Sequence, residues 1–249
     1  MRLTPEVYLV GGGPTFAFGL SSDPDCHVYL VDGGEELALI DCGMGDGDSL
    51  DRIVENIREE GLDPSRLRHL LLTHYHIDHA GGAAGLQERF DLITYAAWDA
   101  AEALRAGDEG ATSLDVAKRA GFYRADYHFR PCRVDRELRE GDRVRVGSLE
   151  LEVYETPGHC NGHLSFLLRG RALAYLFAAD AVFHGGRVVL QNIHDCSVTK
   201  SAESVAKLAA LEFDALLPGH VAIALRDGRK HVEIAHDTFQ HLFVPRSFM

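Results

Sequence analysis

A strand–helix–strand pattern occurs twice in this sequence, and in each copy an acidic residue follows the first strand and a histidine follows the second. In the first copy, the apolar run Leu37–Ile40 leads to Asp41, and the run 70–72 leads to Thr73 and His74. Apolar side chains at helical spacing separate the two runs. The pattern predicts a βαβ unit with polar groups at the ends of its strands.

The second copy begins at residues 174–177 and reaches Asp180. A helical stretch follows, and the short apolar run 215–217 then leads through a Pro-Gly turn to His220. Open α/β sheets bind their ligands at the carboxyl ends of strands. Two such halves facing each other would bring both Asp–His pairs to one cleft, so we expect an α/β fold with two similar halves.

The region between the two copies contains a further hairpin and a longer polar segment. Residues 143–146 and 149–153 alternate apolar and polar side chains on either side of a Gly-Ser turn, which predicts two paired strands. The stretch 98–133 has a mostly helical pattern. Because no linker or low-complexity segment interrupts the chain, we expect residues 1–249 to form a single domain.

The densest chemical signal is the sequence Thr-His-Tyr-His-Ile-Asp-His-Ala-Gly-Gly, which begins at residue 73. It places His74, His76, Asp78 and His79 directly after a buried strand. Burying four such groups without a compensating ion would be costly. One metal ion takes three or four protein ligands, and these four divide naturally between two adjacent ions.

Two ions need more ligands than this segment supplies, and the rest of the chain offers them. His159 and His220 each follow a Pro-Gly turn, and Asp180 ends an apolar strand. Nitrogen and carboxylate ligands without thiolate suit zinc, and also iron, manganese or cobalt. The residues therefore predict a site for two metal ions, with zinc as the first choice.

Taken in order, these blocks resemble the metallo-β-lactamase superfamily, and the segment from His74 to the second of the two glycines resembles its glyoxalase-II branch. The resemblance runs from about Val28 to His220. It implies a four-layer αββα sandwich whose halves correspond to the duplication. Only residues 221–249 follow His220, too few for the helical glutathione-binding domain of glyoxalase II, so specificity for hydroxyacylglutathione is not expected.

The resemblance also assigns roles to individual residues. It implies that one metal is held by His74, His76 and His159, and that Asp180 bridges the two metals. The second metal would be held by Asp78, His79 and His220. Asp41 would orient the ligands without touching metal, a support that metal sites routinely need.

The activity implied is hydrolysis of a small-molecule ester, thioester or lactone by a hydroxide shared between the two metals. Asp78 would be catalytic by orienting that hydroxide and passing its proton to the leaving group. Two alternatives remain open. One is a mononuclear iron persulfide dioxygenase, which uses a subset of these ligands, and the other is a metal-binding family member without catalysis.

Composition restricts the partners and the compartment. The net charge of −13 argues against nucleic acid, whose phosphates are bound by clustered Lys and Arg. No apolar run reaches the roughly 18 residues that cross a membrane, and the N-terminus lacks the pattern of a signal peptide. The 5 cysteines are scattered, which favours reduced, structural thiols. We therefore expect a cytoplasmic protein that acts on a small molecule.

One segment is left with two interpretations. Residues 122–129 combine aromatic side chains with Arg and His, which suits either a wall of the substrate pocket or a packed face that includes a homodimer contact. Packing is slightly favoured. His163 lies close to His159 in the sequence, but the resemblance does not place it on a metal.

Overall fold

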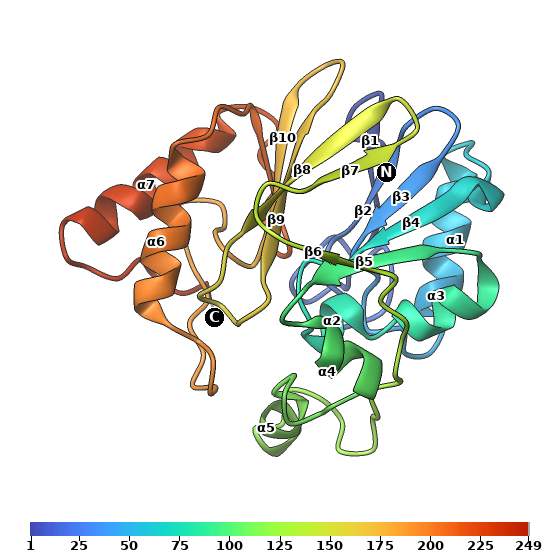
Figure 1. Ribbon diagram of the computed structural model, residues 1–249, viewed down its shortest axis with the longest axis horizontal. Helices are drawn as coiled ribbons and strands as arrows, with labels where there is room; N and C mark the ends of the chain where they lie inside the picture. The colour runs from blue at the N-terminus through green and yellow to red at the C-terminus, as the bar shows by residue number, and fades with distance from the viewer. Residues whose placement is uncertain (249) are drawn as a thin grey trace.

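The structure is a computed structural model that describes residues 1–248, and two β-sheets form its centre (Figure 1). The first sheet has the strand order β1-β2-β3-β4-β5-β6. Its first three strands pair antiparallel, and the pairs from β3 onward are parallel. The strands are β1 (Val7–Gly11), β2 (Val28–Asp32), β3 (Leu37–Ile40), β4 (Leu67–Leu71), β5 (Ile93–Ala97) and β6 (Arg136–Leu138).

The second sheet has the order β11-β10-β9-β8-β7. Only β10 and β11 are parallel; the other pairs are antiparallel, as in the predicted hairpin of β7 and β8. The parallel pairs β3–β4 and β10–β11 correspond to the two copies of the duplicated pattern. The strands are β7 (Arg143–Val146), β8 (Leu149–Glu155), β9 (Leu164–Arg169), β10 (Ala174–Ala179) and β11 (Ala215–Pro218).

Helices cover the outer face of each sheet, which gives the four layers that the resemblance implies (Figure 1). The first sheet is flanked by α1 (Ser49–Glu59), the short α2 (Ile77–Ala80) and α3 (Ala83–Arg89). The second is flanked by α6 (Val198–Ala209) and α7 (Gly228–Gln240). A short 3-10 helix, Pro64–Arg66, precedes β4.

The two sheets share one apolar core. Leu30 and Leu39 of the first sheet and Phe166 and Phe177 of the second are fully buried in the same cluster. All four residues of β3 are buried, as expected for a strand covered on both faces. At about 25 cal/mol per Å² of buried apolar surface, this core is the main stabilising contribution. It leaves the polar ends of the strands at one edge of the sandwich.

The prediction that residues 98–133 are mostly helical is wrong. Only α4 (Ala101–Ala106) and α5 (Leu114–Arg119) are helical, and the rest of the segment is loop. The reason is local: α4 ends at Gly107, whose φ of 64° is left-handed and closes the helix. The loop is nevertheless anchored, because Tyr127 and Phe129 are buried in the core.

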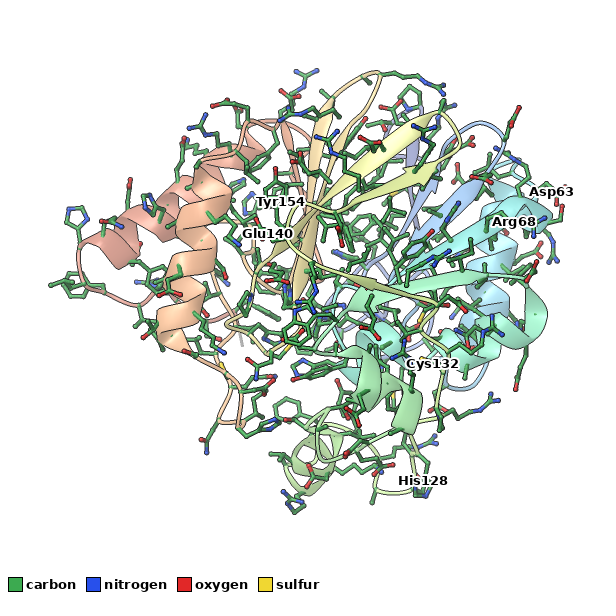
Figure 2. The ribbon with its side chains drawn as sticks, viewed as in Figure 1. Asp63, Arg68, His128, Cys132, Glu140 and Tyr154 are labelled. Carbon is green, nitrogen blue, oxygen red and sulfur yellow. The ribbon has the colours of Figure 1, made fainter. Side chains whose placement is uncertain are left out.

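Many charged side chains lie at the periphery of this fold. Figure 2 shows Asp63 and Arg68 on the outer side near α1, and His128 at the far end of the α5 region. His128 is 80% exposed at its side chain and pairs with Glu109. Within residues 1–248, the helices are all too short or too polar to traverse a lipid bilayer.

The sheets also meet at their ends, where the β2–β3 turn contacts the β7–β8 turn. The backbone N–H of Ser148 donates to the carbonyl of Gly33 at 2.9 Å, and the Ser148 hydroxyl donates to it at 3.0 Å. A Cβ at Gly33 would lie 2.0 Å from the carbonyl oxygen of Val146. The close approach of two backbones therefore requires glycine here.

We predict that Gly33→Ala lowers the free energy of unfolding by about 1–3 kcal/mol, the usual cost of overpacking. Urea denaturation measures this value. Gly110→Ala is the control, because its Cβ would meet only the side-chain oxygen of Asp108, at 3.3 Å. Equal stability of the two variants would show that the junction of the two turns is not tightly packed.

Candidate metal centre

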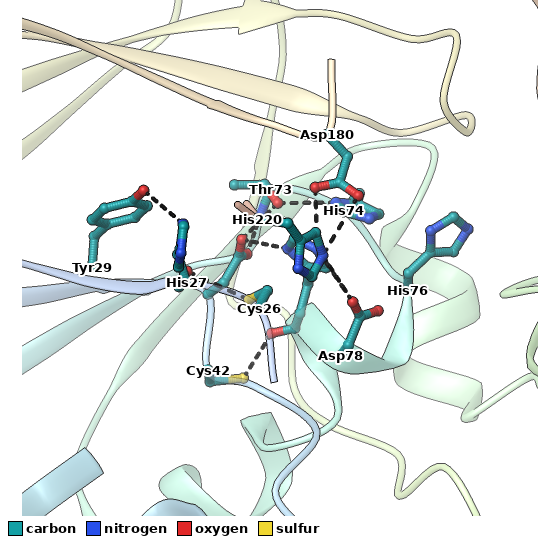
Figure 3. Close-up of polar contacts among 12 residues, drawn as sticks. Cys26, His27, Tyr29, Cys42, Thr73, His74, His76, Asp78, Asp180 and His220 are labelled. Carbon is teal, nitrogen blue, oxygen red and sulfur yellow. Dashed lines mark hydrogen bonds and ion pairs between the residues drawn. The ribbon is translucent and has the colours of Figure 1, made fainter. Parts of the chain in front are cut away.

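The predicted ligands come from four separate segments of the sequence and converge at one edge of the sandwich. Figure 3 shows five of them close together: His74, His76, Asp78, Asp180 and His220. Each lies just beyond the carboxyl end of a strand or in the first turn of the helix that follows. The loop after β4 and helix α2 supply four of them, and single residues follow β8, β10 and β11: His74, His76, Asp78, His79, His159, Asp180 and His220.

One group consists of three histidines. His76 Nδ1 and His159 Nε2 are 2.8 Å apart. The ring of His74 lies 4.8 Å from that of His76 and 5.1 Å from that of His159, measured between centroids. One nitrogen of each residue lies within 4.8 Å of the others, a spacing that suits three ligands of one metal ion.

A second group lies beside it and contains Asp78, His79 and His220. His220 Nε2 is 3.1 Å from Asp78 Oδ2, and His79 Nε2 is 3.7 Å from the same oxygen. These three ligand atoms also lie within 4.8 Å of one another. Both triads that the resemblance implies are thus close enough to hold one ion each, and His74, His79 and Asp180 form a further group of this kind.

The carboxylate of Asp180 lies between the two triads. Its Oδ2 is 3.5 Å from His159 Nε2 in the first triad and 3.8 Å from His220 Nε2 in the second. Its Oδ1 is 3.5 Å from His79 Nε2. A carboxylate that reaches donors on both sides is placed to join two cations.

Asp41 supports the second triad through a hydrogen bond to His79. Its Oδ2 accepts a hydrogen bond from His79 Nδ1 at 2.8 Å, and Thr73 donates its backbone N–H and its hydroxyl to the two oxygens, each at 2.8 Å. In the neutral ring, donation by Nδ1 leaves the lone pair of His79 on Nε2, which lies toward Asp78 and Asp180. Asp41 has a left-handed φ of 61°, a conformation that Asp tolerates better than most residues.

Several buried atoms in this centre have no hydrogen-bond partner among the described residues. They include Nε2 of His74, Nε2 of His79 and Oδ1 of Asp180. Leaving buried polar atoms unpaired is costly. Gly219 adds a steric argument, because a Cβ there would lie 2.3 Å from Asp180 Oδ1. The donors and the space they enclose therefore fit metal ions.

Burial and neighbouring charges set the protonation of these groups. Burial lowers the pKa of His74 and of His159 well below the usual value, and adjacent histidines lower it further. Both therefore stay neutral at pH 7, the form that binds metal. Burial opposes ionisation of Asp78, but His79 and His220 outweigh it and hold its pKa well below the ordinary value.

Sequence reasoning missed two contacts of the centre. The Thr73 hydroxyl lies 3.0 Å from His74 Nδ1 and so links this ligand to Asp41. The Tyr123 hydroxyl donates to Asp78 Oδ1 at 2.9 Å. Burial and the charge of Asp78 raise the pKa of this phenol, which remains a donor. The position of Tyr123 within the aromatic segment 122–129 is the sequence signal for this contact. The sequence pattern slightly favours packing as the role of that segment.

Nine of the 14 histidines lie outside the two triads, and His163, His184 and His231 are among them. His163 has both ring nitrogens engaged, with the hydroxyl of Thr156 at 2.9 Å and the backbone N–H of Asp180 at 3.2 Å. It supports the Asp180 turn and does not offer a free nitrogen. His184 packs against His231, with ring centroids 4.0 Å apart.

The architecture and the donor set are those of a known family. The family model of the metallo-beta-lactamase superfamily matches residues 23–220. This chain belongs to that superfamily. The match contains both triads, Asp180 and Asp41, so the assignment covers the whole centre.

Relatives in the superfamily have hydrolase names. The chain is 32% identical over 165 residues to a hydroxyacylglutathione hydrolase of Chelativorans sp. (strain BNC1), covering 66% of this chain and 51% of that protein. It is 30% identical over 210 residues to the acyl-coenzyme A thioesterase MBLAC2 of Gallus gallus, covering 78% and 72%. The chain thus spans about half the length of the first of these relatives.

Solved structures confirm the four-layer fold. A metallo-beta-lactamase from Cronobacter sakazakii superimposes with a TM-score of 0.73 at 23% identity, over 97% of this chain and 95% of that one. At this identity the likeness concerns the fold alone.

We predict that Asp41→Asn weakens binding of one metal equivalent about 10- to 100-fold, the usual effect of losing a carboxylate behind a ligating histidine. Competition with a chromophoric zinc chelator measures the affinity. Asp135→Asn is the control, since its carboxylate accepts from the backbone N–H of Thr94 in the same sheet, away from the histidines. Unchanged affinity in Asp41→Asn would contradict the role assigned to Asp41.

Proposed function

We propose that this protein is a metal-dependent hydrolase with two metal ions, zinc being the first choice, and that it cleaves thioesters of small thiols. The observation that supports the proposal most strongly is the position of Asp180 between the two triads, 3.5 Å from His159 on one side and 3.5 Å from His79 on the other. A site for a single ion would not need a carboxylate that contacts both groups.

Bound metal ions would supply an activated water and would polarise the carbonyl that it attacks. Orientation of the ligands and proton transfer are assigned to side chains of this protein. Asp41 fixes the orientation of His79 through a 2.8 Å hydrogen bond. In this proposal Asp78, which faces the centre with Oδ2, orients the attacking water and carries its proton to the departing thiolate. Cleavage then yields a carboxylic acid and a free thiol.

No cysteine among the described residues is placed to act as a covalent nucleophile instead. Cys26, Cys42 and Cys160 are completely buried, Cys132 is nearly so and Cys196 is partly exposed, and burial raises the pKa of all five thiols. A buried thiol with a raised pKa is a poor nucleophile at neutral pH. This supports direct attack by water.

The names of two relatives support a thioester substrate within the wider class of esters and lactones. One is called a hydroxyacylglutathione hydrolase and the other an acyl-coenzyme A thioesterase. Both names refer to an acyl group on the sulfur of a small thiol. A small-molecule substrate also agrees with the net charge of −13, which disfavours nucleic acid as a partner. We also propose a cytoplasmic location, because all 5 cysteines are free thiols, the form that a reducing compartment maintains.

The proposal is tested by elemental analysis of protein purified without added metal, together with a panel of thioesters, lactones, β-lactams and phosphodiesters. We expect two zinc ions per chain and the highest kcat/KM on a thioester. One iron per chain with sulfite formation from a persulfide would instead identify a dioxygenase. Bound metal without turnover of any substrate would identify a binding protein.

We predict that Asp180→Ala loses at least one metal equivalent and lowers kcat/KM by more than about 100-fold, because removing a ligand between two cations leaves their charges uncompensated. Asp214→Ala is the control, since its carboxylate bonds the backbone N–H of Ala174 at the opposite end of β10. Full activity and full metal content in Asp180→Ala would overturn the two-metal proposal.

A further inference from the structure

The loop that follows α5 reaches into the candidate centre at one point. Tyr123 donates its hydroxyl hydrogen to Asp78 Oδ1 at 2.9 Å, although the two residues are 45 positions apart. Part of the Tyr123 side chain is exposed, but its hydroxyl lies at the carboxylate of Asp78, whose side chain is only 14% exposed. The contact therefore comes from segment 122–129, for which the sequence allowed either a pocket wall or a packed face.

The two oxygens of Asp78 have different surroundings. Oδ2 faces the second triad, 3.1 Å from His220 Nε2 and 3.7 Å from His79 Nε2. Oδ1 accepts the hydrogen bond from the phenol of Tyr123 at 2.9 Å. A carboxylate without such a partner can rotate, or can turn both oxygens toward a cation.

We propose that Tyr123 is a positioning residue that holds Asp78 so that only Oδ2 is presented to the second metal ion. The inference rests on the proposed function, because it concerns the second of the two metal positions. Ligating carboxylates are commonly oriented by hydrogen bonds from residues that do not touch the metal. Here the hydrogen bond comes from Tyr123, which lies outside the segments that supply the candidate ligands.

The hydroxyl of Tyr123 is not what holds the loop in place. Arg124 pairs with Asp46 at 3.2 Å, and the Tyr127 hydroxyl donates to the carbonyl of Met44 at 2.9 Å. Phe129 is buried in the core. Because these contacts anchor the segment, removing the Tyr123 hydroxyl should leave the fold intact.

Tyr127 provides a matched control within the same loop. Both tyrosines donate at 2.9 Å to a residue of another segment, but only Tyr123 contacts a candidate ligand. Tyr123→Phe and Tyr127→Phe each remove one hydroxyl and nothing else. A merely structural role would give the two variants similar behaviour.

The experiment titrates zinc into metal-free protein in competition with a chromophoric chelator. We expect Tyr123→Phe to weaken one of the two zinc equivalents about tenfold and to leave the other unchanged. Tyr127→Phe should change neither. In a His220→Ala background, which disrupts the second triad, Tyr123→Phe should leave the remaining affinity unchanged, since its effect acts through that triad.

The outcomes separate this inference from the proposed function. If wild-type protein binds two zinc ions and cleaves thioesters, equal affinities in Tyr123→Phe and wild type overturn the inference alone. If no thioester is cleaved but the second equivalent is still weakened, the inference stands and the proposed function fails. Binding of fewer than two ions by wild-type protein overturns the inference, as does equal weakening of both equivalents.

Discussion

The centre of this protein depends on a group of buried imidazoles and carboxylates that cannot satisfy one another by hydrogen bonds. Asp180 stands between two triads, and its Oδ1 has no hydrogen-bond partner in the described part of the chain. His74 and His79 each direct an unpaired Nε2 toward the same region. The core of the sandwich brings these groups together, and a cation is the natural partner for donors arranged in this way.

Much of this arrangement could be predicted because it depends on strand ends. The apolar runs that became β3, β4, β10 and β11 are short and unambiguous, and the polar residues that follow them end up at one edge because parallel strands point the same way. The split into two triads, by contrast, came from the family resemblance. The distances now show which atoms lie together, while the metals and the roles of the residues remain predictions.

The segment 98–133 shows where prediction from the sequence failed. Its apolar residues suggested helix, but the left-handed glycine after α4 ends the helix after six residues, and long-range contacts determine the path of the loop. The contact between Tyr123 and Asp78 spans two elements that share no local pattern. Such a contact depends on how the loop docks, which periodicity and propensity do not encode.

The superfamily fold explains why the chemistry and the specificity separate in this chain. The rigid strand ends position the donors, whereas a surrounding loop supplies Tyr123, which contacts Asp78. The relatives with hydrolase names belong to the same family, but their matches cover only 66% and 78% of this chain.

The central claim is that one carboxylate and two triads hold two cations. The most direct measurement is anomalous diffraction at the zinc edge from crystals of the protein grown with zinc. The account predicts two anomalous peaks about 3.5–4 Å apart on either side of Asp180, one beside His159 and the other beside His220. A single peak, or two peaks elsewhere on the molecule, would contradict it.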